Sequence, residues 1–188
     1  MNCQKIANQH NRCKALCLQF PHCACEQHSV SSYSPGIVQD EEYLVRLIFS
    51  PTHFNEQTGK LKPFAFFDCK DKGLSVNRMQ YTSAEELKQT AAFISHGRKI
   101  IGVVVAKCAD IRAVLDEHER AFCVYDTATK NNPSHADICQ AVAEPCQLTE
   151  TGKGRKRGSQ LRRKLMKLFS EHPLTLEDAF SKLLNTDA

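Results

Sequence analysis

The stretch that most constrains the fold is KIIGVVVAK, at residues 99–107. A continuous apolar run of this length predicts a β-strand that is buried on both faces. We therefore expect a β-sheet in which this strand is central. Four further stretches rich in aliphatic or aromatic residues predict other strands: YLVRLIF (43–49), FAFF (64–67), GLSVNRM (73–79) and AFCVYDT (121–127).

Helices are predicted between these strands and after them. Ser83 is followed three residues later by Glu86, a pairing that satisfies free backbone N–H groups at the start of a helix. ADIRAVLDEH (109–118) predicts a second, short helix. The expected fold class is therefore α+β, with a mixed β-sheet of about five strands packed by one or two helices.

Two C-terminal amphipathic helices complete the predicted fold. The first has an apolar stripe at positions i, i+4, i+7 and i+8, formed by Leu161, Leu165, Leu168 and Phe169. Pro173 separates it from the second, which begins at Thr175. A helix with such a stripe buries it against another element, so both helices are expected to dock.

The 188-residue chain is predicted to have three parts. These are a Cys-rich, flexible leader (1–40), an α+β domain (41–150) and a basic helical tail (151–188). A domain of this size buries enough surface to fold without metal or disulfides. No apolar run approaches the roughly 20 residues that are needed to cross a bilayer.

The leader contains RCKALCLQFPHCACEQH, in which four cysteines and two histidines lie close together. Zinc takes about four nitrogen or thiolate ligands, so Cys13, Cys17, Cys23 and Cys25 are candidate zinc ligands. Structural zinc sites commonly use two ligand pairs separated by a longer loop, and this spacing differs. The favoured interpretation is a flexible leader without metal.

The start of the chain has no recognisable secretory signal. The expected compartment is therefore a reducing cytoplasm, in which disulfides are rare. This disfavours disulfides for all ten cysteines. Cys108 and Cys123 lie in apolar segments and are interpreted as buried thiols that pack as small hydrophobes.

Positive charge is concentrated in the tail. Eight of the 25 basic residues lie between Gly152 and Lys167, a stretch without acids, so the other 17 are outnumbered by 21 acidic residues. A cationic amphipathic helix can contact nucleic-acid phosphates. The predicted contacts are Lys153, Arg155, Lys156, Arg157, Arg162, Arg163, Lys164 and Lys167. An anionic membrane, a protein partner and a merely solvated helix face are the alternatives.

The polar segment NNPSHAD (131–137) contains a candidate catalytic histidine. His135 can act as a general base, and the nearby Asp137 can orient it. The favoured alternative is a turn at Asn132-Pro133, with Ser134 or Asp137 capping the next segment.

Arg46 is a charged residue in the middle of an apolar strand, which is costly unless it is paired or binds an anion. Ser75, Asn77 and Arg78 on a neighbouring strand can join it around a phosphate-bearing ligand. The following YTSAEEL resembles the second motif of small NAD-consuming ADP-ribosyltransferase-like domains. Those domains also carry an arginine on an early strand, so the resemblance implies an enzyme acting on a nucleotide or NAD-like substrate. The charged strand residue and the polar loop after the last strand of the body make Arg46, Ser75 and His135 its candidate catalytic residues.

The leading hypothesis is a cytoplasmic bacterial accessory protein whose basic C-terminal helix binds nucleic acid or a partner. The nucleotide- or NAD-directed enzyme is the second hypothesis. A protein–protein interaction module without chemistry is the third.

Overall fold

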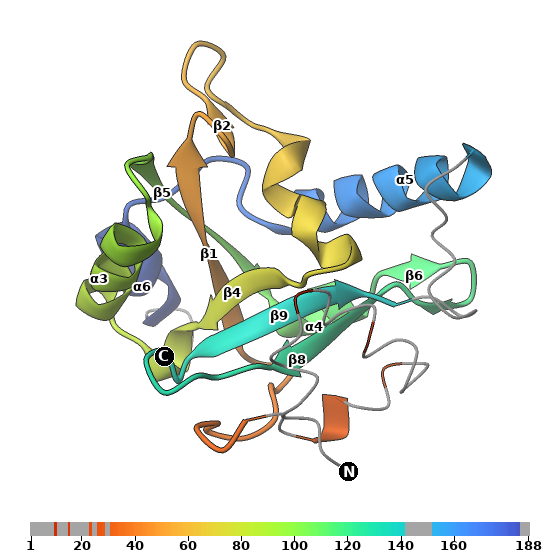
Figure 1. Ribbon diagram of the computed structural model, residues 1–188, viewed down its shortest axis with the longest axis horizontal. Coiled ribbons are helices and arrows are strands. Elements are labelled where there is room, and N and C mark those ends of the chain that lie inside the picture. Colours follow the sequence, from red (N-terminus) through yellow and green to blue (C-terminus); the bar gives the residue numbers. More distant parts are fainter. Residues whose placement is uncertain are drawn as a thin grey trace.

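The computed structural model describes residues 10, 15, 23, 26–28, 31–141 and 152–184. At its centre is a five-stranded sheet with the order β5-β1-β4-β9-β8 (Figure 1). Its strands are β1 (Tyr43–Ser50), β4 (Leu74–Arg78), β5 (Lys99–Lys107), β8 (Phe122–Asp126) and β9 (His135–Gln140). The α+β class and the number of strands are confirmed. All pairings in this sheet are antiparallel, whereas a mixed sheet was predicted.

Helices and two short hairpins surround this sheet. The helices are η2 (Pro63–Lys70), η3 (Met79–Tyr81), α3 (Ala84–Ile94), α4 (Cys108–Arg112), α5 (Gly152–Leu168) and α6 (Leu176–Leu184). The hairpins pair β2 (Phe54–Asn55) with β3 (Lys60–Leu61) and β6 (Leu115–Asp116) with β7 (Glu119–Arg120). At the start of α3, Ser83 and Glu86 form the predicted reciprocal capping arrangement.

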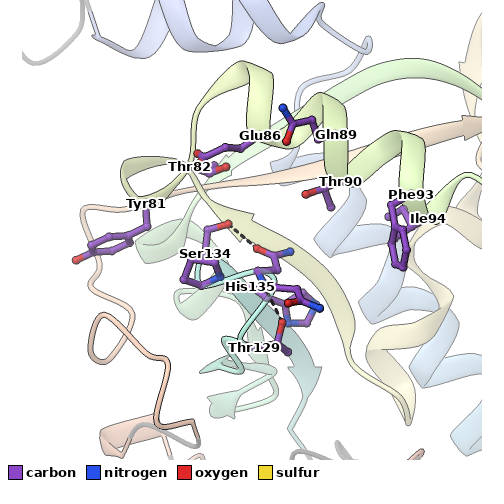
Figure 2. Close-up of a pocket in the computed structure, with 13 residues that line it drawn as sticks. Tyr81, Thr82, Glu86, Gln89, Thr90, Phe93, Ile94, Thr129, Ser134 and His135 are labelled. Carbon is purple, nitrogen blue, oxygen red and sulfur yellow. Dashed lines mark hydrogen bonds between the residues drawn. The ribbon is translucent and has the colours of Figure 1, made fainter.

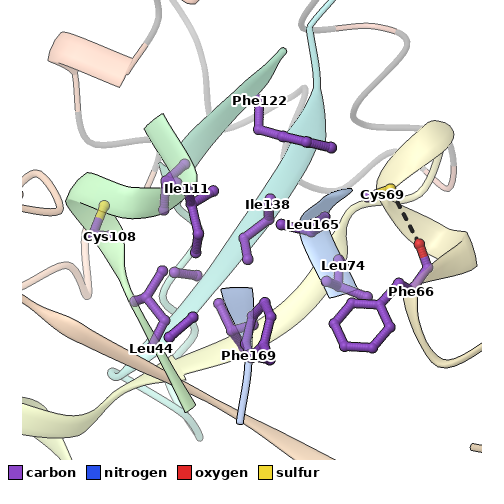
Figure 3. Packing of buried hydrophobic residues seen from close by; sticks show 14 of the residues in the cluster. Leu44, Phe66, Cys69, Leu74, Cys108, Ile111, Phe122, Ile138, Leu165 and Phe169 are labelled. Atoms are coloured by element: carbon purple, nitrogen blue, oxygen red, sulfur yellow. Dashed lines mark hydrogen bonds between the residues drawn. The ribbon is translucent and has the colours of Figure 1, made fainter. Parts of the chain in front are cut away.

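The larger part of the core lies on one side of the sheet, beneath η2, α4 and α5 (Figure 3). Leu161, Leu165 and Phe169 from the predicted apolar stripe are buried there, and Phe169 packs against Phe66 of η2. The other side is covered by α3 and α6, which bury Leu87, Ala91 and Ala179 against β1 and β5. The two C-terminal helices therefore pack on opposite sides of one sheet.

The strand KIIGVVVAK forms β5, which lies at an edge of the sheet rather than at its centre. It is nevertheless apolar on both faces because helices cover both. The segment between α5 and α6 shields its open edge: the N–H groups of Val103 and Leu174 each donate to the other's carbonyl, at 2.9 and 2.8 Å. Burial on both faces thus does not distinguish a central strand from a covered edge.

The segment FAFF belongs to η2 and is not a strand. Pro63 begins this 3₁₀ helix, and Ala65, Phe66 and Cys69 are buried while Phe64 and Phe67 are exposed. Burial here follows a helical repeat, whereas a strand would bury alternate residues. Pro63 supplies a helix-compatible φ and lacks the N–H that a strand would use.

A disulfide links Cys23 of the leader to Cys123 of β8, and Cys139 is also disulfide-bonded. The interpretation of Cys123 as a free thiol was therefore wrong, whereas Cys69 and Cys108 are free and buried. Glu26 of the leader is buried as well and accepts a hydrogen bond from the N–H of Val124. These leader residues are thus attached to β8, the edge strand opposite β5.

Candidate functional site

A cleft with a volume of about 630 Å³ lies between α3 and the loop that joins β8 to β9 (Figure 2). We call it the His135 cleft. Tyr81, Thr82 and the exposed side of α3 form one wall. Thr129 and the segment from Asn131 to His135 form the other. His135 is the first residue of β9 and is half-buried in this wall.

A chain of three side chains orients the His135 ring. The Thr127 hydroxyl donates to Oδ2 of the buried Asp137 at 2.8 Å, so the hydrogen bond between Thr127 Oγ1 and His135 Nδ1, also 2.8 Å, is donated by the histidine. Nδ1 also lies 3.2 Å from the Thr127 carbonyl, which can only accept. The proton of the neutral ring is therefore on Nδ1, and Nε2 carries the lone pair.

The predicted histidine–carboxylate relation thus exists, but through Thr127. His135 and Asp137 are two residues apart on β9 and share a face of the sheet, while Thr127 directly follows β8. The sequence analysis associated His135 with Asp137 because both lie in one polar segment, and it missed Thr127 and the strand β9. The signal that could have found them is a polar residue just after one strand and two at alternate positions of the next.

The predicted turn is also present. The His135 N–H donates to the Asn132 carbonyl at 3.3 Å and closes the turn at Asn132-Pro133. The Ser134 hydroxyl donates to Oδ1 of Asn132 at 2.9 Å. Asn132 in turn donates to Oδ1 of Asn77 on β4 at 2.8 Å. Ser134 is buried in this network and does not bond the His135 ring. It therefore serves to hold the loop against β4.

Arg46 and Ser75 do lie together, as their predicted strands suggested. The Arg46 side chain is only 6% exposed, and its Nη1 donates to the Ser75 carbonyl at 2.7 Å. Its Nε has no hydrogen-bond partner within the described parts of the chain. Burial lowers the Arg46 pKa to about 10, an effect that the negative charge of Asp68 opposes. Neither Arg46 nor Ser75 is among the residues that line the His135 cleft.

The same cationic environment acts on His53. This histidine follows β1, and its Nδ1 accepts the Phe49 N–H at 3.3 Å. Burial, followed by the positive charges of Arg46 and Arg98, lowers the His53 pKa to about 4. His53 is therefore neutral at physiological pH and acts as a hydrogen-bond acceptor for the backbone.

Arg78 is engaged in structural contacts and is not free for a ligand. It is fully buried, donates twice to Glu42 at 2.6 and 2.7 Å, and donates to the carbonyls of Gly36 and Ile37. Its guanidinium also lies over the Tyr81 ring, with Cζ 4.5 Å from the ring centroid. Arg78 therefore ties the segment before β1 to the wall of the His135 cleft.

The basic residues of α5 fall into two groups. Three contact the body of the protein: Arg157 bonds Asp116 at 2.7 Å, Arg162 lies over the Phe67 ring at 5.2 Å, and Lys164 reaches the Leu115 carbonyl at 3.1 Å. Arg163 and Lys167 are exposed, one helical turn apart, and have no hydrogen-bond or ion-pair partner among the described residues. The side chains of Lys153, Arg155 and Lys156 lie outside the described residues.

Two hollows border the exposed side of α5. One of about 410 Å³ is lined by Arg157, Arg163, Lys164 and Lys167, together with Asp116. The other, of about 500 Å³, lies between Lys167 and Lys60 and also includes Glu171 and His172. Lys167 lines both hollows. We call the side chains of Arg163, Lys164 and Lys167 the cationic face. Lys164 belongs to it because it stays exposed and its bond goes to the uncharged Leu115 carbonyl, whereas Arg162 is half-buried over Phe67.

The candidate zinc ligands are placed only in part. Cys23 is bonded to Cys123 and has no thiolate to offer a metal, while Cys13, Cys17 and Cys25 lie outside the described residues. Among the residues that the structure describes, no group of three or more His, Cys, Asp or Glu is placed to hold a metal ion. Nor is any described helix long and apolar enough to cross a membrane.

Comparison with known proteins finds no matching family model, curated protein or solved structure. The His135 cleft and the cationic face are the two regions whose side chains offer binding chemistry to a ligand.

Proposed function

We propose that the protein binds nucleic acid through the cationic face of α5. The observation that carries this proposal is the way in which the helix docks. Leu161 and Leu165 are buried in the core, which orients Arg163 and Lys167 toward solvent. The backbone of the docked helix is already ordered, so only the side-chain entropy of these cations is lost when they contact phosphates.

The number of available cations limits the mode of binding. Arg157 is neutralised by Asp116 and Glu117, and the Asp116 hydrogen bond raises the Arg157 pKa. Arg162 is held over Phe67. Of the eight predicted phosphate contacts, the described side chains that stay available are therefore the three of the cationic face. Contacts of this kind go to the phosphate backbone and give affinity without sequence preference.

Double substitution of Arg163 and Lys167 tests the proposal. Arg163→Ala combined with Lys167→Ala removes two phosphate contacts, and we expect the affinity for labelled RNA or DNA to fall by roughly tenfold or more at about 0.1 M salt. Fluorescence anisotropy measures the change. Lys88→Ala combined with Lys130→Ala is the matched control, because it removes the same charge from exposed positions outside α5.

The control variant is expected to bind within about twofold of the wild type. Equal losses of nucleic-acid affinity in the two double variants would show that binding depends on the net charge of the protein alone. That result would contradict a binding site on α5. Wild-type protein that binds neither single- nor double-stranded nucleic acid at low salt would refute the proposal.

A further inference from the structure

We propose that the His135 cleft binds a small, uncharged nitrogen heterocycle of the nucleobase class, with His135 Nε2 as a hydrogen-bond acceptor. This site lies beside α3 and shares no residue with the cationic face. It is therefore independent of the nucleic-acid proposal. Three features of the cleft carry the inference: an oriented acceptor, two exposed rings and the absence of lysine and arginine from its lining.

The acceptor is His135 Nε2. The chain from Asp137 through Thr127 places the ring proton on Nδ1 and fixes the ring plane. Nε2 makes no hydrogen bond to the described residues, although its ring lines the cleft. An oriented lone pair at a cleft wall is matched by a ligand N–H donor, which nucleobases and related heterocycles possess.

The two rings are Tyr81 and Phe93, which lie at opposite ends of the cleft in Figure 2. The buried Arg78 covers one face of Tyr81, while the Tyr81 residue is 39% exposed. Glu42 fixes Arg78 by an ion pair, so one face of the Tyr81 ring packs against a guanidinium that is itself held in place. Phe93 is 85% exposed, an unusual state for a phenylalanine on a packed helix. Exposed rings beside polar groups suit the stacking of a planar heterocycle.

The charge of the lining decides against phosphate. Among the described residues that line the cleft, Glu86 is acidic and none is a lysine or arginine. The Glu86 carboxylate caps α3 by accepting from Ser83 N and Oγ at 2.8 and 3.0 Å. A phosphate entering this cleft would lie near that carboxylate, and the loop lysine Lys130 is exposed and is not among the lining residues. A free base or nucleoside is therefore favoured over its nucleotide.

The remaining polar groups fit such a ligand. The amides of Gln89 and Asn131 line the cleft and offer both donors and acceptors, as a heterocycle edge requires. The cleft volume of about 630 Å³ falls within the range of about 300–1,000 Å³ that small-molecule sites occupy. A nucleoside thus fits the cleft in size as well as in chemistry.

Nuclear magnetic resonance of the ¹⁵N-labelled full chain tests the proposal. Adenosine, guanosine, cytidine and uridine are titrated separately, each beside its 5′-monophosphate. We expect at least one nucleoside to shift the amide signals of residues 129–135 and of α3, and its monophosphate to bind several-fold more weakly. His135→Phe keeps a ring but removes the acceptor, and should weaken binding by about tenfold.

Matched aromatic variants distinguish the cleft from the rest of the surface. Phe93→Ala should weaken nucleoside binding by a few-fold or more, whereas Phe64→Ala, an equally simple loss of an exposed ring on η2, should leave it unchanged. No shift with any nucleoside at millimolar concentration would overturn the proposal. Unchanged binding in His135→Phe, or tighter binding of the monophosphate, would also overturn it.

A measurement on the wild-type protein tests the role of His135 without relying on variants that could fail to fold. Long-range ¹H–¹⁵N correlation spectra at alkaline pH report which ring nitrogen of His135 carries the proton. The proposal requires protonated Nδ1 and a bare Nε2 whose resonance moves when the nucleoside is added. A proton on Nε2, or an Nε2 signal that does not respond to a bound nucleoside, would contradict it.

Discussion

The cationic face and the His135 cleft differ in charge although both are built on the same sheet. Around α5, Arg163 and Lys167 are exposed without partners among the described residues. Around α3, the described residues that line the cleft supply amides, hydroxyls, aromatic rings and the Glu86 carboxylate, and none of them is a lysine or arginine. The first region is suited to polyanions and the second to uncharged ligands.

The two regions also differ in how the chain holds them. The α5 helix is held by burial of its apolar stripe against η2 and the sheet. The cleft histidine lies on β9, which pairs with β8, and β8 is linked to the leader by the Cys23–Cys123 disulfide. A substitution that removes one region should therefore leave the other's binding intact in protein that stays folded.

The largest expected effect comes from the disulfide. Cys23→Ala combined with Cys123→Ala opens a cross-link that spans 100 residues. We expect the free energy of unfolding to fall by about 3–5 kcal/mol, because loss of the cross-link restores chain entropy to the unfolded state. Urea denaturation monitored by circular dichroism measures this change.

The matched control for this variant is Cys69→Ala, which removes a buried free thiol. It should cost about 1 kcal/mol, the scale of a small lost side chain. Equal costs for the two variants would show that the disulfide contributes no more than packing. Folded Cys23→Ala/Cys123→Ala protein should keep its nucleic-acid affinity, since the cationic face does not include β8.

A smaller loss is expected when the docking of α5 is weakened. Leu165 is fully buried, and Leu165→Ala should lower the free energy of unfolding by about 3 kcal/mol through lost burial and a cavity. Leu168→Ala is the control, because Leu168 is only partly buried at the margin of the same core. It should cost about 1 kcal/mol. A cost for Leu165→Ala no larger than this would contradict the docked helix.

Local sequence patterns predicted much of the fold. The Ser83–Glu86 pair predicted the start of α3, and the leucine spacing predicted which side of α5 is buried, because both depend on neighbours a few residues apart. FAFF was assigned wrongly because a four-residue apolar run does not distinguish a strand from a helical turn. The edge position of β5 depends on the order of the strands, and its burial depends on the cover that Leu174 provides. Neither is contained in a local sequence pattern.

The candidate sites were predictable to the extent that they are local. Closeness in one polar segment associated His135 with Asp137, but Thr127 joins them only once β8 pairs with β9, a strand that was not predicted. The charge of α5 was plain in the sequence, whereas the pairing of Arg157 with Asp116 depends on the β6–β7 hairpin. The Cys23–Cys123 bond was predicted against because a reducing compartment was expected, and two cysteines 100 residues apart carry no spacing signal that could have indicated it.

The salt dependence of nucleic-acid binding tests the central claim most directly. Each phosphate contact contributes a slope of about −0.9 in log K against log salt for duplex DNA. The three residues of the cationic face predict about −2.7, and Lys153, Arg155 and Lys156 would extend this to about −5.4 if they take part. Arg157→Ala and Arg162→Ala should leave the slope unchanged, because both residues contact the body instead. A slope near −7, or one that falls by about 0.9 in either variant, would contradict the account.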